Sequence, residues 1–300
     1  MAADPGPRLR MSRRNLLRIC IPLLGRFPAL SYPFGWFAGW VAWNIRPAMR
    51  RRLTRTMLPL CGGNRRLARH AGLAACRNVA WYWIDLCTLR YRDLSRVEHD
   101  HLRLVNPQRL AVLAEPGPVI VVSAHTGNAE LAIQALTYRG RPFVALVEPL
   151  QPRDFALDLL RLRSVAGGQF HEASFGGLRA CIEALEDGGL VGVMGDRDIQ
   201  GSGVCVEFCG RTVKLPRGPW DLARRTRSVV LPVLSSRIRR DDFAVWVEEP
   251  IRVAQTADPE HDIREAIERW CLILEKHLRR DPAQWTVLED FWEVHRCGEG

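Results

Sequence analysis

Residues 118–131 read PVIVVSAHTGNAEL, and this stretch joins a strand to a helix. The apolar run at 118–124 is short and rich in valine, which is typical of a strand buried on both faces. Residues 128–140 have a helical pattern that ends at a glycine. His125 follows the strand, and Glu130 lies five positions later. The stretch therefore predicts a strand-to-helix turn that carries a histidine and an acid.

The same alternation of strands and helices continues along the chain after about residue 95. Further strands are predicted at 141–149, 190–196, 228–238 and 242–251, and helices at 64–92, 153–168, 175–189 and 262–282. Short alternating elements indicate a mainly parallel or mixed sheet covered by helices. We expect an α/β protein in two parts: residues 1–94 form a helical, membrane-associated arm, and residues 95–300 form one α/β domain.

The positive charge of the chain is concentrated at its N-terminus. The net charge is +10, and residues 1–60 contain eleven arginines against one acidic residue, Asp4. The remaining residues carry equal numbers of basic and acidic side chains. A cationic segment suits nucleic acid or an anionic membrane surface.

The apolar content of this segment favours the membrane. Residues 27–45 read FPALSYPFGWFAGWVAWNI, without a charge, and arginines lie on both sides. Trp36, Trp40 and Trp43 recur at helical spacing, and tryptophans are typical of the lipid headgroup level. Prolines and glycines interrupt the run, which favours an interfacial or re-entrant anchor over a single spanning helix. A buried core helix is the third alternative. We expect the protein at the cytoplasmic face of the inner membrane, held through its first 60 residues.

The nine cysteines are scattered, and no Cys-x-x-Cys pair occurs. An odd, unpatterned set predicts reduced thiols that face the cytosol, without a disulfide framework or a zinc site. We expect neither a metal nor a cofactor.

His125 is the candidate general base. Ligands gather at the carboxyl ends of parallel strands, where His125 is expected. Glu130 can hold the imidazole in one orientation, although a histidine and an acid at this spacing also occur by chance. The chain has no Gly-x-Ser-x-Gly elbow, phosphate loop, dinucleotide fingerprint or cluster of metal ligands. The histidine is therefore expected to activate a nucleophile of the substrate, such as a lipid hydroxyl.

The segment HTGNAE (125–130) resembles the His-x-x-Asn-x-Glu motif of the bacterial lipid A biosynthesis lauroyl/myristoyl acyltransferases, of the lysophospholipid acyltransferase-like superfamily, and of the related phosphatidylinositol mannoside acyltransferases. Three further segments are similar in the same order: LRLRSVAGG (160–168), the block at 195–237, and RRDPAQWTVLEDFW (279–292). The family usually has Trp where this chain has Ala129, which opens space beside the motif.

This resemblance implies a glycerolipid-acyltransferase-like fold, a mixed sheet flanked by helices. It implies acyl transfer from a thioester, with acyl-CoA or acyl carrier protein as co-substrate. His125 would be the general base and Glu130 its partner. Backbone amides near Gly127–Asn128, or the guanidinium of Arg197 or Arg217, would stabilise the oxyanion.

Six residues are candidates for binding substrate, each with a structural alternative. Asn128 could instead cap a helix, and the acidic and basic side chains could form surface ion pairs. The candidates are Asn128, Arg163, Asp196, Arg197, Asp198 and Arg217.

The sequence thus predicts an acyltransferase (EC 2.3.1 type) that acts on a hydroxyl of a membrane glycolipid. The alternatives are a phospholipid or secondary-metabolite acceptor, or a catalytically silent lipid-binding protein of the same fold. A nucleic-acid binder is disfavoured because the charge is joined to tryptophans and no recognition module follows.

Overall fold

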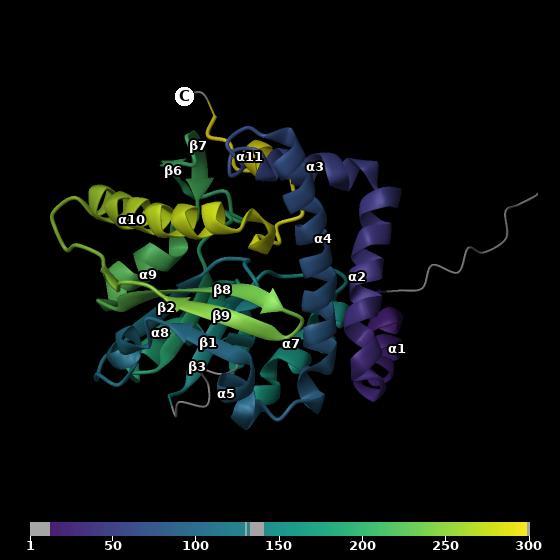
Figure 1. Cartoon of the computed structure of the whole chain (residues 1–300). Helices are drawn as coiled ribbons and strands as arrows, with labels where there is room; N and C mark the ends of the chain where they lie inside the picture. The colour runs from purple at the N-terminus through teal and green to yellow at the C-terminus, as the bar shows by residue number, and fades with distance from the viewer. Residues whose placement is uncertain (1–12, 130, 133–140, 299–300) are drawn as a thin grey trace, which may run out of the picture.

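A mixed β-sheet forms the centre of the molecule in this computed structural model, which describes residues 13–129, 131–132 and 141–298 (Figure 1). Its strands lie in the order β1-β9-β8-β2-β5-β3-β4, and β10 pairs with β8. The pairs β2–β5, β2–β8, β3–β5, β3–β4 and β1–β9 are parallel. The strands are β1 Leu102–Val105, β2 Val119–Ser123, β3 Phe143–Val147, β4 Gln169–Glu172, β5 Leu190–Met194, β8 Val229–Arg239, β9 Asp242–Val247 and β10 Ile251–Arg252. The predicted α/β class with a parallel-rich sheet is confirmed.

Helices surround this sheet, and a separate hairpin lies near α11 (Figure 1). The hairpin pairs β6 (Val204–Phe208) with β7 (Arg211–Leu215). The helices are α1 Arg13–Arg26, α2 Pro28–Ile45, α3 Pro47–Met57, α4 Arg65–Thr88, α5 Val97–His101, α7 Arg153–Arg163, α8 Phe175–Glu186, α9 Gly218–Thr226, α10 Pro259–Arg280 and α11 Phe291–Val294. Short 3₁₀ turns are η1 Leu89–Tyr91, η2 Leu94–Arg96, η3 Pro107–Leu113, η4 Ser164–Ala166 and η5 Pro282–Gln284.

The two faces of the sheet bury alternate residues of each strand, as the two-residue repeat of a strand requires. On β2, Ile120 and Val122 belong to the larger core, which also contains Trp270 of α10. Val119 and Val121 point to the opposite face and pack with Leu110 of η3. Because both faces are covered, the central strands β2, β3 and β5 are almost wholly apolar, and this explains why the sequence revealed them.

The N-terminal helices contribute to the same core. Trp43 of α2 and Leu53 and Met57 of α3 are buried in the cluster that includes Ile120 and Trp270. Helix α4 begins at Asn64, whose side chain accepts hydrogen bonds from two backbone amides of the first turn. It runs beside α2 and crosses the edge of the sheet at which β8 ends (Figure 1). The division between residues 94 and 95 stays a prediction.

Several predicted elements match the structure, and four strands were missed. The missed strands are β1, β4, β6 and β7, which are short and have few consecutive buried residues. Of the predicted helix at 128–140, only Ala129, Leu131 and Ala132 lie in a described helical segment. In the part of the chain that the structure describes, no helix combines the length and the apolar character that a membrane span needs.

The expectation of reduced cysteines throughout was wrong. Cys205 of β6 forms a disulfide with Cys297, which follows α11. The two cysteines are 92 positions apart in sequence, so no spacing motif could have revealed the pair. The other seven cysteines are free.

Candidate active site

His125 and Asp196 face each other because they follow two neighbouring parallel strands. Strands β2 and β5 pair in a register that sets Ser123 opposite Met194. His125 and Asp196 each lie two residues further along, so the sheet carries them to the same edge. The Nδ1 atom of His125 is 2.8 Å from Oδ1 of Asp196. The backbone N–H of His125 donates to Oδ2 of the same carboxylate at 3.0 Å.

The Asp196 carboxylate is buried and ionised. Its side chain has 0% exposure, whereas that of His125 is 32% exposed. The indole N–H of Trp285 donates to Oδ2 of Asp196 at 2.9 Å. Burial alone would raise the pKa of Asp196, but the charge and hydrogen bonds of His125, together with Trp285, lower it to about 2. An ionised carboxylate only accepts hydrogen bonds, so Nδ1 of His125 carries a proton, and whenever the imidazole is neutral its Nε2 is the acceptor.

The turn that carries His125 is fixed by backbone contacts from two other segments. The carbonyl of His125 accepts hydrogen bonds from the amide and the hydroxyl of Thr286, at 2.8 and 2.9 Å. The amide of Gly127 donates to the carbonyl of Gln284 at 3.0 Å. Gly127 has a φ of +54°, and a Cβ there would lie 2.6 Å from the carbonyl oxygen of Ser235. Only glycine fits this position without displacing β8.

The side-chain amide of Asn128 makes contacts at both ends: its oxygen caps the helix that follows, and its nitrogen reaches α4. Its Oδ1 accepts from the amide of Leu131 at 3.0 Å, and its Nδ2 donates to Asp85 of α4 at 2.8 Å. Its backbone amide donates to the Ser235 hydroxyl at 2.9 Å. The amides of Gly127 and Asn128 that the sequence suggested as oxyanion donors therefore already have partners. Glu130 lies outside the described residues.

Arg197 follows Asp196 and lies in a cluster of charges. Its guanidinium forms a two-point contact with Glu289 at 2.8 and 2.9 Å, and its Nη1 donates to Oε2 of Glu148 at 3.2 Å. His295 contacts the same Glu289 carboxylate at 2.8 Å. Burial would raise the pKa of Glu289, but these contacts with His295 and Arg197 lower it to about 2. Arg197 is thus a cation held beside the His125–Asp196 pair.

Asp198 and Arg163 make structural contacts, one within a loop and the other between two helices. Both oxygens of Asp198 accept backbone hydrogen bonds, from Gly201 at 3.1 Å and Gly203 at 2.8 Å, which closes the loop before β6. Arg163, the last residue of α7, donates to the Tyr82 hydroxyl of α4 at 3.1 Å.

Arg217 precedes α9 and lies away from the pair, beside the start of α10. It pairs with Asp221 and with Glu260, each at 2.7 Å. Trp270, ten residues after Glu260 and so about 15 Å along the helix axis, is the α10 residue that contacts Gly195. The structure brings His125, Asn128, Asp196 and Arg197 to one region, and Arg217 is not among them.

Comparison with protein families shows to which family the chain belongs. The model of the bacterial lipid A biosynthesis acyltransferases matches residues 30–293. The chain belongs to this family. A phosphatidylinositol mannoside acyltransferase of Mycolicibacterium smegmatis is 30% identical over 172 residues, which cover 53% of this chain and 54% of that protein. One of Mycobacterium tuberculosis is 28% identical over 166 residues, which cover 53% and 52%. The chain spans about half the length of the curated relatives it matches.

The segment at 279–292, which resembles the family in sequence, contributes two residues that support the site. Gln284 accepts from the amide of Arg237 at 2.7 Å and supplies the carbonyl that holds Gly127. Trp285 holds Asp196. The sequence marked this segment but gave these two residues no role. Ser235 and Asp85, which also support the turn, carried no signal in a single sequence.

One group of possible metal ligands occurs among the described residues. His101, Asp241 and Asp242 bring three such atoms within 4.8 Å of one another. Arg92 lies 3.5 Å from Asp241, and Arg239 lies 2.8 Å from Asp242. Each of the two carboxylates therefore already has an arginine as its partner, which explains their position without a metal ion.

Proposed function

We propose that this protein transfers a fatty acyl chain from a thioester, acyl-CoA or acyl carrier protein, to a hydroxyl of a membrane glycolipid. The observation that carries this proposal is the partly exposed His125, paired through Nδ1 with the buried Asp196 at the edge of the sheet. Family membership supports the reaction class. The relatives are named phosphatidylinositol mannoside acyltransferases, which favours a glycolipid acceptor.

His125 acts as the general base in this proposal. Its Nε2 takes the proton of the acceptor hydroxyl while the hydroxyl oxygen attacks the thioester carbonyl. The tetrahedral intermediate then collapses, the C–S bond breaks, and the leaving sulfur takes the proton from the imidazolium. The products are an ester and a free thiol, and no acyl-enzyme forms.

Asp196 orients His125 and stabilises the imidazolium that forms during the reaction. The two contacts from His125 to its carboxylate support this role. Glu130, the partner that the sequence predicts, is the second candidate for the role. The acyl-transfer rates of Asp196→Asn and Glu130→Gln, measured side by side, show which of the two carboxylates has this role.

Arg197 is the proposed cation for the developing oxyanion. It follows Asp196 directly in the sequence. Its contact through Nη1 with the half-exposed Glu148 is the longest of its three contacts with carboxylates. A substrate carbonyl could replace Glu148 there, while the two-point contact with Glu289 keeps the guanidinium in place.

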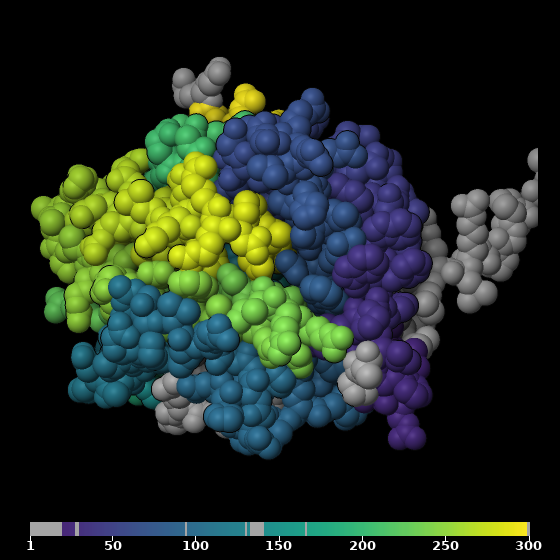
Figure 2. All heavy atoms as spheres, in the orientation of Figure 1, coloured from purple at the N-terminus to yellow at the C-terminus, as the bar shows by residue number. Residues whose placement is uncertain are grey.

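The N-terminal helices are the proposed membrane contact. One side of α2 exposes large apolar side chains at intervals of three and four residues, and α2 lies at the surface beside α4 (Figure 2). Exposed arginines of α3, the next helix, add positive charge, which suits an anionic bilayer surface. The residues are Leu30, Phe34, Phe37 and Trp40 on α2 and Arg51 and Arg52 on α3.

An acyl-transfer assay tests the function. Purified protein is incubated with labelled acyl-CoA or acyl carrier protein and a membrane lipid extract, and labelled lipid is measured for the wild type and for His125→Ala. We expect transfer by the wild type and at least about a hundredfold less by the variant. Equal transfer by both would remove His125 from the mechanism. Vesicle binding by both without transfer would favour the silent lipid-binding alternative.

A further inference from the structure

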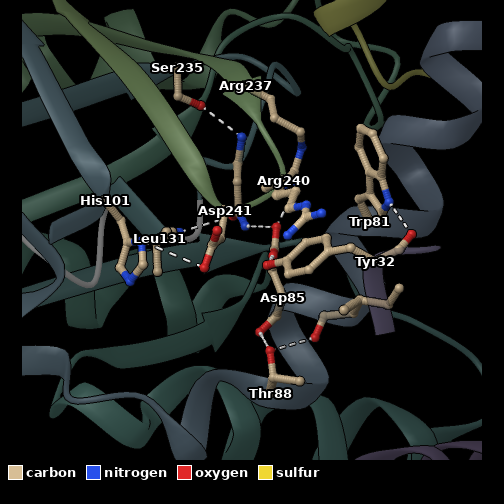
Figure 3. A network of polar contacts seen from close by, with 12 residues as sticks. Tyr32, Trp81, Asp85, Thr88, His101, Leu131, Ser235, Arg237, Arg240 and Asp241 are labelled. Atoms are coloured by element: carbon tan, nitrogen blue, oxygen red, sulfur yellow. Dashed lines mark hydrogen bonds and ion pairs between the residues drawn. The ribbon is translucent and has the colours of Figure 1, made fainter. Parts of the chain in front are cut away.

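A buried carboxylate on α4, Asp85, lies at the centre of a polar cluster that reaches the motif turn. We propose that Asp85 is a positioning residue for the acyltransferase site: it orients the Asn128 side chain and thereby fixes the turn that carries His125. This inference rests on the proposed function. Figure 3 shows the Tyr32, Asp85 and Arg237 side chains turned toward a common point.

Four donors from four segments of the chain reach the Asp85 carboxylate. Its Oδ1 accepts from the Tyr32 hydroxyl at 2.5 Å and from Arg92 at 3.2 Å. Its Oδ2 accepts from Arg237 at 2.6 Å and from Asn128 at 2.8 Å. The side chains of Asp85 and Arg237 are each only 2% exposed. Loss of this one carboxylate would leave several buried donors without their partner, which is costly in a protein interior.

Asp85 determines which way round the Asn128 side chain lies. A carboxylate that already accepts from two arginines and a tyrosine offers only acceptor atoms, so the NH₂ group of Asn128 must face it. The amide oxygen of Asn128 then faces the helix and accepts from Leu131. One end of the amide is therefore fixed by charge on α4, and the other caps the helix that follows the histidine turn.

The same cluster holds the turn through Arg237. The backbone of Arg237 exchanges two hydrogen bonds with the Gln284 side chain, at 2.7 and 3.2 Å. The carbonyl of Gln284 accepts from Gly127. Arg237 also stacks over Phe243, with its guanidinium carbon 4.5 Å from the ring centroid. Asp85 thus reaches the turn by two routes, through the side chain of Asn128 and through the strand that carries Arg237.

Tyr32 joins the cluster to α2. Its hydroxyl donates to Asp85 and accepts from Arg92 at 2.6 Å. Burial, and after it the Asp85 charge, raise the pKa of Tyr32 far above its ordinary value, so the hydroxyl keeps its proton. The Tyr32 hydroxyl hydrogen-bonds to Asp85 and Arg92 and, among the described residues, to no residue of the motif turn. Tyr32→Phe is therefore a matched control, because it removes one donor to Asp85 and leaves Asn128 in place.

A reciprocal exchange tests the inference. Asp85→Asn, Asn128→Asp and the double variant are compared with the wild type in the acyl-transfer assay, with kcat and KM for the acyl donor measured separately. Asn128→Asp keeps a good helix cap but sets two carboxylates against each other. We expect each single variant to lose at least about tenfold in kcat, about 1.4 kcal/mol of transition-state stabilisation. The KM of the single variants for the acyl donor should stay within about threefold of the wild-type value. The kcat of Tyr32→Phe should also stay within about threefold of that of the wild type.

The double variant restores one carboxylate and one amide at this contact. We expect its kcat to exceed that of Asn128→Asp by at least about fivefold. A double variant no faster than the slower single variant would overturn the inference, and so would single variants with wild-type kcat. If Asp85→Asn does not fold, Asn128→Asp is compared with Asn128→Ser, which caps the helix without a charge. Equal kcat of these two variants would also overturn it.

Melting temperatures of the same proteins supply a readout that needs no activity. Recovery of the melting temperature in the double variant measures the Asp85–Asn128 contact itself. A wild type that transfers no acyl group, together with such a recovery, would count against the proposed function alone. No recovery in either readout would count against the role of Asp85.

Discussion

His125 and Asp196 are joined twice, through the imidazole Nδ1 at 2.8 Å and through the histidine backbone amide at 3.0 Å. Both residues lie two positions beyond a paired residue of adjacent parallel strands. The sheet therefore sets their separation, and the pair does not depend on a long loop. A site built on strand ends is held rigidly, as a general base and the group that orients it require.

Gly127→Ala should damage the site more than glycine substitution elsewhere. The left-handed backbone alone costs alanine about 1–2 kcal/mol, and the clash with the Ser235 carbonyl at 2.6 Å adds to this. We expect acyl transfer to be lost. We also expect the clash to lower the free energy of unfolding by about 1–3 kcal/mol beyond the loss that backbone strain causes. Gly201→Ala is the control, because Gly201 has a φ of +75° and no atom within 4 Å of a built Cβ. Equal losses from the two substitutions would contradict the account.

The apolar side of α2 should control membrane binding. The triple variant Phe34→Ser, Phe37→Ser and Trp40→Ser should weaken binding to anionic phospholipid vesicles by at least about tenfold, since each substitution removes apolar area from the interface. Co-sedimentation with vesicles measures this. Deletion of residues 1–60 is a poor test, because Leu53 and Met57 are part of the core.

Phe175→Ser supplies the control for that experiment. Phe175 is 88% exposed but lies on α8, on another side of the molecule from α2 (Figure 1). Its substitution should leave vesicle binding unchanged. If the triple variant binds as well as Phe175→Ser, α2 is not the membrane contact.

Stability should fall in two stages as the pH is lowered. Burial lowers the pKa of His277 from 6.5 to about 4, so between these values the unfolded chain binds a proton that the folded protein does not. Stability should fall by up to about 3 kcal/mol across this window. Asp196 and Glu289 have lowered pKa values of about 2. The stability that they contribute above pH 4 is lost as the pH falls toward 2.

Urea unfolding measured from pH 7 to pH 2 tests both stages. His277→Gln should flatten the curve between pH 6.5 and pH 4 and leave the lower stage intact. A wild-type curve that is already flat in the upper window would show that His277 is protonated in the folded state.

The Cys205–Cys297 disulfide should stabilise the C-terminal segment in oxidised protein. Its closed loop is long, with a sequence separation of 92, and loop entropy predicts a contribution of up to about 4 kcal/mol. Cys297→Ser should lower the free energy of unfolding, and a reductant should have the same effect on the wild type but none on the variant. A thiol assay of the unfolded, unreduced protein should find seven free thiols. Nine would mean that the bridge is absent.

The sequence predicted the sheet well because its central strands are apolar on both faces. It also predicted the position of His125 at the edge of the sheet, since a residue directly after such a strand lies where ligands gather in sheets of this kind. Asp196 was selected only as a binding residue, although it is the last residue of the predicted strand at 190–196, and His125 directly follows the predicted strand at 118–124. Strand order would have paired them, but one sequence does not reveal that β2 and β5 are neighbours.

The supporting residues could not have been found from sequence in the same way. Asp85 lies in a helical segment with ordinary spacing, and its partners Tyr32, Asn128 and Arg237 are 43 or more positions away. Only the packing of α4 against the sheet edge brings them together. Short strands such as β6 and β7 were missed because hairpin pairing, and not an apolar run, stabilises them.

The kcat of Asp196→Asn in the acyl-transfer assay tests the central claim most directly. Asparagine keeps the size of the side chain but removes the charge that orients His125 and stabilises the imidazolium. We predict a loss of about a hundredfold to ten-thousandfold in kcat, with vesicle binding unchanged. A kcat within about threefold of the wild type, in a variant that folds normally, would contradict the His125–Asp196 pair as the catalytic centre.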